Sequence, residues 1–515
     1  MSSLAHPTQS EPLAATPSSK RIELWFRRVL WICTIVAGLG LLCHLAILLW
    51  AQQEFSAPES IVATQSLQLA RHGTLYYDLS KYPYTVSLYM PQFYLLEAGL
   101  NKLGLPTALA GRLVSYLAML GLFVLVWKLI ILYTGNRLYA WTGTVLCAST
   151  SLILAWGTIG QVDTLAVFWA IAAFYEYSRY SISGEPTLIW AGAFALLAFF
   201  TKQTAIACPL TIFVMLWFTR RKTALLFGAV LGGTVLVLAL AINAALGGRF
   251  LLNTVFANMN ELALAKLGPH IQYILVAAAQ LILVAIAGIK QAWRAHKIAP
   301  FVYLAFATLV LAITAPKLGS DSNYQIESTI VLVICASIAL DALNFFELCF
   351  RGSRSWITLL QLPLAIHVVQ NFRIMEHVLV TRIVTEQMLR TQVAELRPYA
   401  DQGGRLLSSD FNSMARLRGY MEVEPFLYSQ LVKSGRVDPE PVRADIAAEK
   451  FATIFLFEDM NLREHNPDPE VTTFTESQIQ EIKQHYRAVA HVAGPYQDGI
   501  FVYRPIGQPI GQKPL

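Results

Sequence analysis

Long apolar segments separated by short polar loops recur along the first 373 residues of the chain. Each has close to the length that a helix needs to cross a lipid bilayer. The pattern predicts a bundle of about eleven transmembrane helices. The segments lie at 24–50 and at about 108–133, 140–157, 163–180, 186–201, 203–218, 224–246, 270–289, 299–315, 327–348 and 356–373.

Basic residues near the ends of these segments predict the orientation of the bundle, because loops rich in Lys and Arg stay in the cytoplasm. The first segment is too long for the core of a signal peptide, and its flank holds Lys20, Arg21 and Arg28. The N-terminus is therefore expected in the cytoplasm. With eleven spans, every later basic loop also falls on that side: Lys128 and Arg137, Arg179, Arg220 to Lys222, Lys290 to Lys297, and Arg351 with Arg354.

One apolar stretch, residues 88–103, does not fit this alternation. It is short and contains Pro91, Glu97 and Lys102, so we expect a helix that lies on the outer interface. If it crossed the membrane instead, the count would become twelve and the agreement of the basic loops would be lost.

Charged residues divide the chain near residue 373. They make up 34 of the last 142 residues but only 38 of the first 373. The division predicts a transmembrane domain at 21–373, with a large first outer loop at 51–107, and an extracytoplasmic domain at 374–515. Residues 1–20 are rich in Ser, Pro, Thr and Ala, which is typical of a disordered tail.

The last 142 residues begin with a predicted helix that continues the final span to about residue 397. Strand-like runs then alternate with helical patterns, which predicts a small α/β domain. We expect strands at 405–409, 453–457, 488–492 and 500–503, and helices at 424–434, 441–450 and 476–486. No nucleophile, metal or phosphate-loop signature marks this domain as a second catalytic site.

The overall composition supports a membrane protein and excludes other classes. Apolar residues make up 55% and charged residues 14% of the 515, and the mean hydropathy is +0.49. Nucleic-acid-binding and disordered proteins need far more charge than this chain has, despite its net charge of +6. The six Cys and ten His residues show no ligand spacing, so we predict neither a disulfide nor a metal site.

The predicted topology collects ionisable residues from four separate segments on the outer face. An ionisable group at membrane depth is costly, so it usually faces a polar cavity or a partner. Cations there could hold the phosphate of a lipid-linked donor, and a carboxylate could take a proton from an acceptor hydroxyl. Plainer interpretations are solvated loop acids, a helix cap at Asp163 and a snorkelling Lys202. The set comprises Glu59, Arg71 and Asp78 in the first loop, then Asp163, Lys202, and Lys317 to Glu327.

Several short motifs, in order along most of the chain, resemble the polytopic GT-C glycosyltransferases of the family 39 type. This family includes protein O-mannosyltransferases and bacterial aminoarabinose transferases. The similar motifs are Pro58-Glu59 with Gly73, Tyr89-Met90-Pro91, Gly111-Arg112-Leu113, Gln161-Val162-Asp163, Thr201-Lys202-Gln203, and Asn323-Tyr324 with Glu327.

The resemblance implies roles for these residues. Glu59 and Asp163 are expected to be catalytic, with Glu59 as general base or orienting group. The residues expected to bind the substrate or its phosphate are Arg71, Asp78, Tyr89, Arg112, Lys202, Gln203, Lys317, Asn323, Tyr324 and Glu327.

Two positions depart from the family pattern. The family's loop has an Asp-Glu pair, and Pro58 stands in place of its first acid, the presumed catalytic carboxylate. Either Glu59 takes the role or the base lies elsewhere, with Asp78 and Asp163 as candidates. Met90 replaces a family Lys, which weakens the case for an aminoarabinose donor.

The sequence thus favours an integral-membrane glycosyltransferase of a bacterial inner membrane. It would move a sugar from a polyprenyl-phosphate donor to a lipid, glycan or protein acceptor on the periplasmic face. No nucleotide, cofactor or nucleic acid is required, and a divalent cation is left open. The alternatives are a secondary transporter, which predicts two similar halves and a site at the midplane, and a non-catalytic membrane scaffold.

Overall fold

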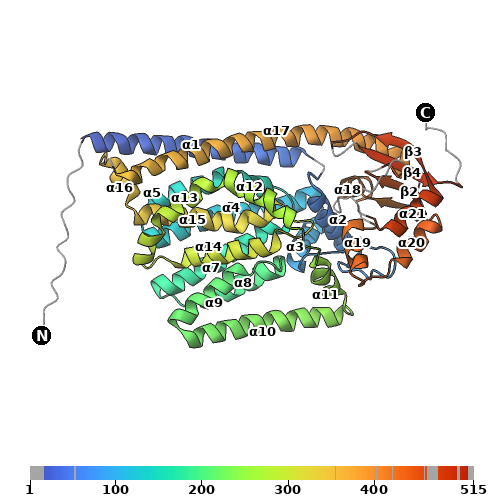
Figure 1. Cartoon of the computed structure of the whole chain (residues 1–515), viewed down its shortest axis with the longest axis horizontal. Coiled ribbons are helices and arrows are strands. Elements are labelled where there is room, and N and C mark those ends of the chain that lie inside the picture. The colour runs from blue at the N-terminus through green and yellow to red at the C-terminus, as the bar shows by residue number, and fades with distance from the viewer. Residues whose placement is uncertain are drawn as a thin grey trace.

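A computed structural model of the chain shows an elongated helical bundle with a small mixed domain at one end (Figure 1). It describes residues 17–51, 54–353, 355–401, 403–419, 422–457, 459–460, 474–495 and 499–507. Most of the predicted tail, residues 1–16, and the loop residue Arg354 lie outside these ranges. The first helix, α1, covers Pro17–Trp50 and so includes the last residues of the predicted tail.

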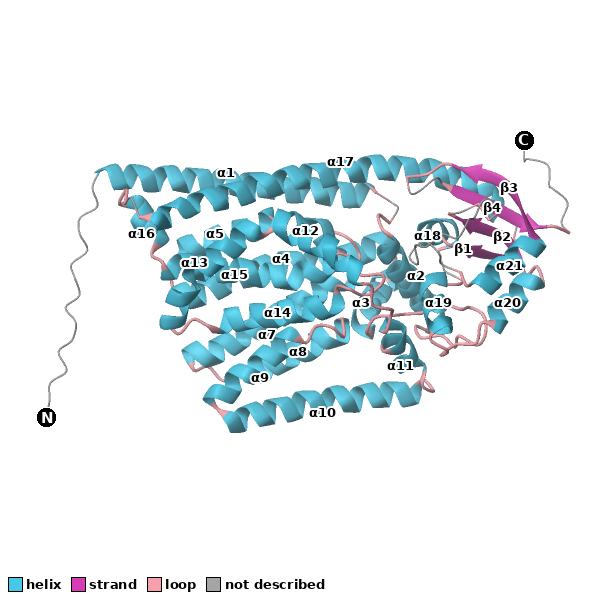
Figure 2. Ribbon diagram, in the orientation of Figure 1, coloured by secondary structure: helices cyan, strands magenta, loops and turns pink. Residues whose placement is uncertain are grey.

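The long helices of the bundle run side by side along the long axis of the molecule (Figure 2). The most extensive helix–helix contacts are those between α7 and α8, α13 and α15, and α4 and α7. The helices are α4 (Thr107–Thr134), α5 (Arg137–Ser149), α6 (Ser151–Gly157), α7 (Val162–Ser183), α8 (Leu188–Thr201), α9 (Ala207–Thr219), α10 (Arg221–Ala245), α11 (Arg249–Thr254), α12 (Leu267–Ala277), α13 (Ala279–Arg294), α14 (Ala299–Thr314), α15 (Ile326–Ala342), α16 (Phe345–Phe350) and α17 (Gln361–Ala400).

The chain is a multi-pass membrane protein. By length and apolar composition, four helices within the described ranges qualify as spans: Lys20–Trp50, Thr107–Thr134, Arg221–Ala245 and Ser322–Ala342. Two bent helix pairs raise the number to six, and α8, α9 and α14 are apolar but shorter. The eleven-span count remains a prediction, because α8, α9 and α14 are shorter than a full span and α7 and α17 are not among the helices that qualify.

Two of the predicted spans are broken, which the hydropathy pattern did not predict. The axis bends by 61° between α5 and α6 and by 73° between α12 and α13. One residue of α17, Asn371, contacts both breaks. Its side-chain oxygen accepts from the Ser151 N–H at 3.0 Å and the Ser151 hydroxyl at 2.9 Å, and its amide donates to the Ala277 carbonyl at 3.3 Å. Backbone groups freed inside a membrane need such partners.

The predicted spans at the end of the bundle also need new boundaries. The span placed at 327–348 ends at Ala342, and α16 follows as a separate helix. The span placed at 356–373 begins with a 3₁₀ turn, Trp356–Leu360, and then continues as α17 without a break to Ala400. The prediction that the last span continues as one helix beyond residue 373 is confirmed, and its outward direction stays a prediction.

The first outer loop contains two helices, α2 (Ala57–His72) and α3 (Pro91–Lys102). Ser56 caps α2, Pro58 stands in its first turn, and Gly73 ends it with φ of 70°, which a residue without Cβ adopts freely. At 12 residues, α3 is too short to cross a bilayer. It packs on α2 and α4 and buries Phe93 and Tyr94 completely.

The C-terminal domain has a four-stranded mixed sheet in the order β1-β2-β4-β3. β1 pairs with β2 in parallel, and β4 is antiparallel to both β2 and β3. The strands lie where the sequence predicts them, at β1 (Arg405–Ser408), β2 (Phe451–Leu456), β3 (Tyr486–Val492) and β4 (Ile500–Pro505). Three predicted helices are also confirmed: α19 (Pro425–Lys433), α20 (Glu440–Ala447) and α21 (Glu476–His485). One helix, α18 (Phe411–Arg418), was not predicted.

Backbone and side-chain bonds attach this domain to the first outer loop. The Tyr84 N–H donates to the Glu422 carbonyl at 2.9 Å, and the Glu424 N–H donates to the Tyr84 carbonyl at 3.2 Å. The Tyr84 hydroxyl also donates to the Asp445 carboxylate at 2.9 Å. The domain and the first loop therefore lie at the same end of the bundle, as Figure 1 shows.

Candidate functional site

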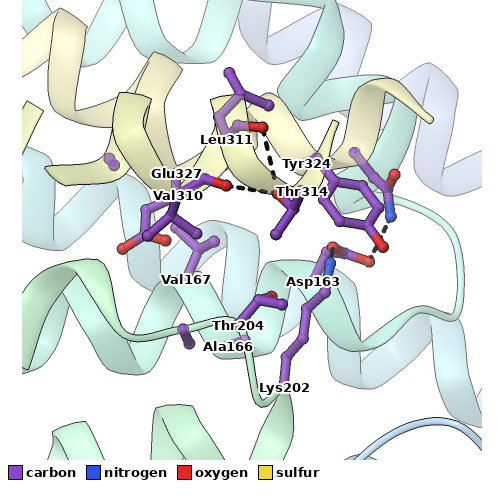
Figure 3. Close-up of a pocket in the computed structure, with 13 residues that line it drawn as sticks. Asp163, Ala166, Val167, Lys202, Thr204, Val310, Leu311, Thr314, Tyr324 and Glu327 are labelled. Atoms are coloured by element: carbon purple, nitrogen blue, oxygen red, sulfur yellow. Dashed lines mark hydrogen bonds and ion pairs between the residues drawn. The ribbon is translucent and has the colours of Figure 1, made fainter. Parts of the chain in front are cut away.

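A small cavity with an ionisable lining lies among α7, α14, α15 and the α8–α9 loop (Figure 3). We call it the Lys202 cavity. Its volume is about 30 Å³, which leaves room for about two water molecules. The lining residues are Asp163, Ala166, Val167, Lys202, Thr204, Ala205, Ala307, Val310, Leu311, Thr314, Asn323, Tyr324 and Glu327.

The ammonium group of Lys202 is the centre of this cavity. Its Nζ lies 2.5 Å from the Asp163 carboxylate and 4.1 Å from the centre of the Tyr324 ring. The Asn323 amide donates to the other Asp163 oxygen at 3.0 Å. Lys202 and Asp163 are only 7% and 3% exposed, so the pair is shielded from bulk water. Four residues that the sequence selected from three segments thus meet at one place.

Local backbone structure places the two members of the ion pair. Asp163 stands in the first turn of α7, where its charge is favourable near the positive end of the helix dipole. Lys202 caps the C-terminus of α8 with extended dihedral angles, φ −145° and ψ 121°, which turn the chain away from the helix axis. The Lys side chain then reaches from the end of one helix to the start of its neighbour, as Figure 3 shows.

Glu327 provides the second carboxylate of the cavity. It stands in the first turn of α15, and its Oε1 accepts a hydrogen bond of 2.7 Å from the Tyr303 hydroxyl. Tyr303 is fully buried in α14, and sequence reasoning missed it. It sits inside an apolar run where no pattern distinguishes it from a packing residue.

Glu59, the leading sequence candidate for the base, lies outside the cavity and is completely buried. It forms an ion pair with Arg112, whose Nε is 2.8 Å from Oε1 and whose Nη2 is 3.2 Å from Oε2. The backbone N–H groups of Gly160 and Phe55 also donate to it, at 2.9 and 2.7 Å. Both carboxylate oxygens are therefore fully occupied by donors within the protein.

The charge state of Glu59 follows from this environment. Burial alone would raise its pKa. The guanidinium of Arg112 and the donated hydrogen bonds lower the pKa by more than burial raises it, so the pKa of Glu59 lies below its ordinary value. Arg112 also donates to the Ala51 carbonyl at 2.8 Å and lies over the Phe55 ring. The pair ties together the end of α1, the start of α2, α4 and the turn before α7.

The other residues predicted to bind substrate fall into two groups. Arg71 and Asp78 are not on the cavity, and Asp78 accepts from the Ser80 N–H at 3.1 Å and its hydroxyl at 2.8 Å. Those bonds lower the pKa of Asp78 below its ordinary value. Tyr89 belongs to the first loop, where its carbonyl accepts from the Tyr76 hydroxyl at 2.9 Å.

Gln203 and Lys317 lie next to the cavity in sequence but bond to neighbouring loops. The Gln203 amide donates to the Leu88 and Thr254 carbonyls at 3.0 and 2.9 Å. Lys317 donates to the Asn258 carbonyl at 3.3 Å. Burial lowers the pKa of Lys317, and the nearby Lys202 ammonium lowers it further.

A further buried cation, besides Lys202 and Arg112, was not predicted from the sequence. Arg382 of α17 is 8% exposed and donates to the Thr158 hydroxyl at 2.7 Å. It lies over the Phe55 ring, with 5.3 Å from the guanidinium carbon to the ring centre. Within the described ranges, no group of three or more His, Cys, Asp or Glu side chains could hold a metal ion.

Comparison with known proteins identifies the class of fold. Residues 91–246 match the family described as dolichyl-phosphate-mannose-protein mannosyltransferase. The structure is similar to that of ArnT from Cupriavidus metallidurans bound to undecaprenyl phosphate, with a TM-score of 0.60 at 11% identity over 93% of this chain and 98% of that chain. Against apo ArnT, the TM-score is 0.59 at 13% identity, over 92% and 97%.

A second solved structure has a similar fold at a lower TM-score. The archaeal oligosaccharyltransferase AglB from Archaeoglobus fulgidus, in complex with an inhibitory peptide and a dolichol-phosphate, has a TM-score of 0.52 at 11% identity, over 95% of this chain and 76% of that chain. Comparison with curated protein sequences finds no significant match. The chain therefore shares the fold of ArnT and AglB. The resemblance to the family 39 type, predicted from the motifs, is confirmed by the family match over residues 91–246.

Proposed function

We propose that this protein is an integral-membrane glycosyltransferase that uses a polyprenyl-phosphate-linked sugar and acts at the Lys202 cavity. The observation that carries the proposal is the buried Lys202 ammonium, held between Asp163 and the Tyr324 ring. A shielded cation suits the phosphate of a lipid-linked donor, because its attraction for a phosphate is stronger where water is excluded.

The donor class is supported by the relatives. The ArnT structure similar to this chain holds undecaprenyl phosphate, and the AglB structure holds a dolichol-phosphate. We place the reaction on the face that carries the C-terminal domain, which the basic loops predict to be the periplasmic side of a bacterial inner membrane.

In the proposed reaction, an acceptor hydroxyl oxygen attacks the anomeric carbon of the sugar and the bond from that carbon to the phosphate oxygen breaks. The proton of the hydroxyl passes to a carboxylate, and the polyprenyl phosphate leaves with its charge stabilised by Lys202. We assign the proton to Glu327, because Tyr303 contacts one of its oxygens and the other has no hydrogen bond within the described chain. Asp163 then has the role of orienting Lys202.

The cavity, at about 30 Å³, is smaller than the usual ligand site, and we propose that its lining moves apart when the donor binds. We propose that the loop from Pro316 to Gln325 moves, since it carries Asn323 and Tyr324 and joins α14 to α15. The buried Glu59–Arg112 pair is proposed to hold the opposite side of the site in place.

The test is transfer of a radiolabelled sugar from polyprenyl phosphates by protein reconstituted in vesicles. Lys202→Gln removes the cation, and we expect the rate to fall by about 100-fold or more. Lys222→Gln is the matched control, because Lys222 is exposed at the other end of the bundle. Equal rates for Lys202→Gln and the wild type would remove this cavity from the mechanism.

The proton acceptor is tested separately. Glu327→Gln should abolish transfer, whereas Asp163→Asn should retain a reduced rate because Lys202 stays in place. If Asp163→Asn abolishes transfer and Glu327→Gln retains a reduced rate, Asp163 is the base instead.

A secondary transporter is the rival, and the two broken helix pairs are the feature that favours it, since broken helices line transporter sites. The described lining of the Lys202 cavity, however, includes no residue of α5, α6, α12 or α13. Uptake of a solute into vesicles, without sugar transfer, would support the transporter.

A further inference from the structure

A second cavity lies at the opposite end of the bundle from the C-terminal domain. It is an apolar slot of about 260 Å³ among α1, α5 and α17. Its walls reach from Trp25 to Cys33 along α1 and from Gln361 to Val369 along α17. Eight residues of helix extend about 12 Å, so the slot follows the direction of the spans. This shape fits a single hydrocarbon chain lying parallel to the helices.

One polar group inside the slot lacks a partner. Thr142 of α5 is only 6% exposed, and its hydroxyl has no hydrogen bond within the described chain. A threonine inside a helix usually bonds to a carbonyl one turn earlier, as Thr144 does to Ala140 at 2.9 Å. Thr142 lies only five residues from the start of α5, which puts it near the level of lipid ester groups. An ester carbonyl would accept the hydrogen bond that its hydroxyl lacks.

Two basic side chains flank Trp25, which lines the end of the slot that we call its mouth. Arg21 and Arg28 lie four residues before and three residues after Trp25, so all three share one face of α1. Both arginines are exposed, and neither forms an ion pair among the described residues. Trp25 itself is 63% exposed, and tryptophan prefers the membrane interface. The mouth of the slot is therefore cationic and lies at the depth of lipid head groups.

We infer that this slot is a binding site for one anionic glycerophospholipid of the leaflet opposite the C-terminal domain. An acyl chain would fill the slot, its ester carbonyl would accept from Thr142, and its phosphate would lie beside Arg21 and Arg28. The site is separate from the Lys202 cavity and does not depend on the proposed transferase activity.

Native mass spectrometry of the full chain after delipidation tests the site, with phosphatidylglycerol, phosphatidylethanolamine or undecaprenyl phosphate added back. We expect one retained phosphatidylglycerol per chain, held roughly tenfold more tightly than phosphatidylethanolamine. Equal retention of the two phospholipids, or preferred retention of undecaprenyl phosphate, would overturn the proposal.

Variants locate the lipid in the slot. Ala365→Trp fills the slot from a lipid-exposed position and should abolish retention, while Ile366→Trp, next to it but outside the slot, should not. Thr142→Val keeps the shape without the hydroxyl and should weaken binding about fivefold.

Charge variants test the mouth. The double variant Arg21→Gln with Arg28→Gln should lose the preference for phosphatidylglycerol, while Lys222→Gln at the same end should keep it.

For the slot variants, equal retention by Ala365→Trp and Ile366→Trp would place the lipid elsewhere and contradict the assignment.

Discussion

Glu59 and Arg112 form a completely buried ion pair across 53 residues of sequence, with Arg112 Nε 2.8 Å from Glu59 Oε1. Both carboxylate oxygens also accept backbone N–H groups, one of them from Gly160, three residues before Asp163. The pair therefore connects the first outer loop to the helix that carries the Asp163–Lys202 contact. Its geometry suits a positioning role better than proton transfer.

Replacing Glu59 should act mainly on the stability of the folded protein rather than on the catalytic step. Glu59→Gln leaves the Arg112 guanidinium buried without its counter-charge, which should lower the free energy of unfolding by about 3 kcal/mol. Thermal unfolding in detergent measures this loss. Asp78→Asn is the control, because Asp78 is an exposed loop acid and its change should stay within about 0.5 kcal/mol. A Glu59→Gln protein that is as stable as wild type but inactive would restore Glu59 as the base.

Glu97 should make stability depend on pH. It is 1% exposed in α3, its Oε2 accepts from the Ser66 hydroxyl at 2.8 Å, and burial raises its pKa to about 8. The folded state therefore holds a proton that the unfolded state releases near its ordinary pKa of 4.5. This contribution to stability is complete below pH 4.5 and is lost as the pH rises through about 8, by at most about 1.4 kcal/mol per unit.

Glu97→Gln isolates this effect. The variant should lose stability less steeply than wild type between pH 5 and about 8, measured as unfolding free energy in buffers of matched ionic strength. Parallel profiles for the two proteins would show that Glu97 is ionised in the folded state.

Asn371 should be needed to hold both broken helices. Asn371→Leu keeps the size of the side chain but removes the acceptor of the Ser151 N–H and one donor to the Ala277 carbonyl, which should cost about 2 kcal/mol. Activity should fall as well, because α6 leads to Asp163 and His270 of α12 bonds to Gln325 of the Tyr324 loop at 2.9 Å. Gln387→Leu, at an exposed position of α17, is the control for a polar-to-apolar change. Unchanged unfolding of Asn371→Leu would show that the breaks are held by other contacts.

The C-terminal domain should control the loop that carries Tyr324. Gly319 has φ of 80°, and a Cβ there would lie 3.2 Å from the Phe426 ring of α19. Gly319→Ala should therefore reduce sugar transfer more than it reduces stability, since the loop must shift. Gly104→Ala is the matched control, because Gly104 has φ of 93° but open space around it. Equal activity losses in both variants would assign the effect to backbone strain alone.

The candidate site was only partly predictable from sequence. Asp163, Lys202, Asn323, Tyr324 and Glu327 could be selected because each interrupts or borders an apolar segment on the predicted outer face. Their convergence on one cavity required the packing of α7, α14 and α15. The structural role of Glu59 could not be predicted from the sequence, because an exposed loop acid and a buried, ion-paired acid can have the same local sequence.

The sequence alone determined the membrane character, the extended last helix and the strands of the C-terminal domain. These follow from hydrophobic length and periodicity, which act locally along the chain. Only the tertiary structure decided that Arg112 neutralises Glu59, that Tyr303 bonds to Glu327, and that Asn371 fills both helix breaks. Each of these contacts joins different elements, and burial at membrane depth selects the partner that satisfies a charge or a free backbone group.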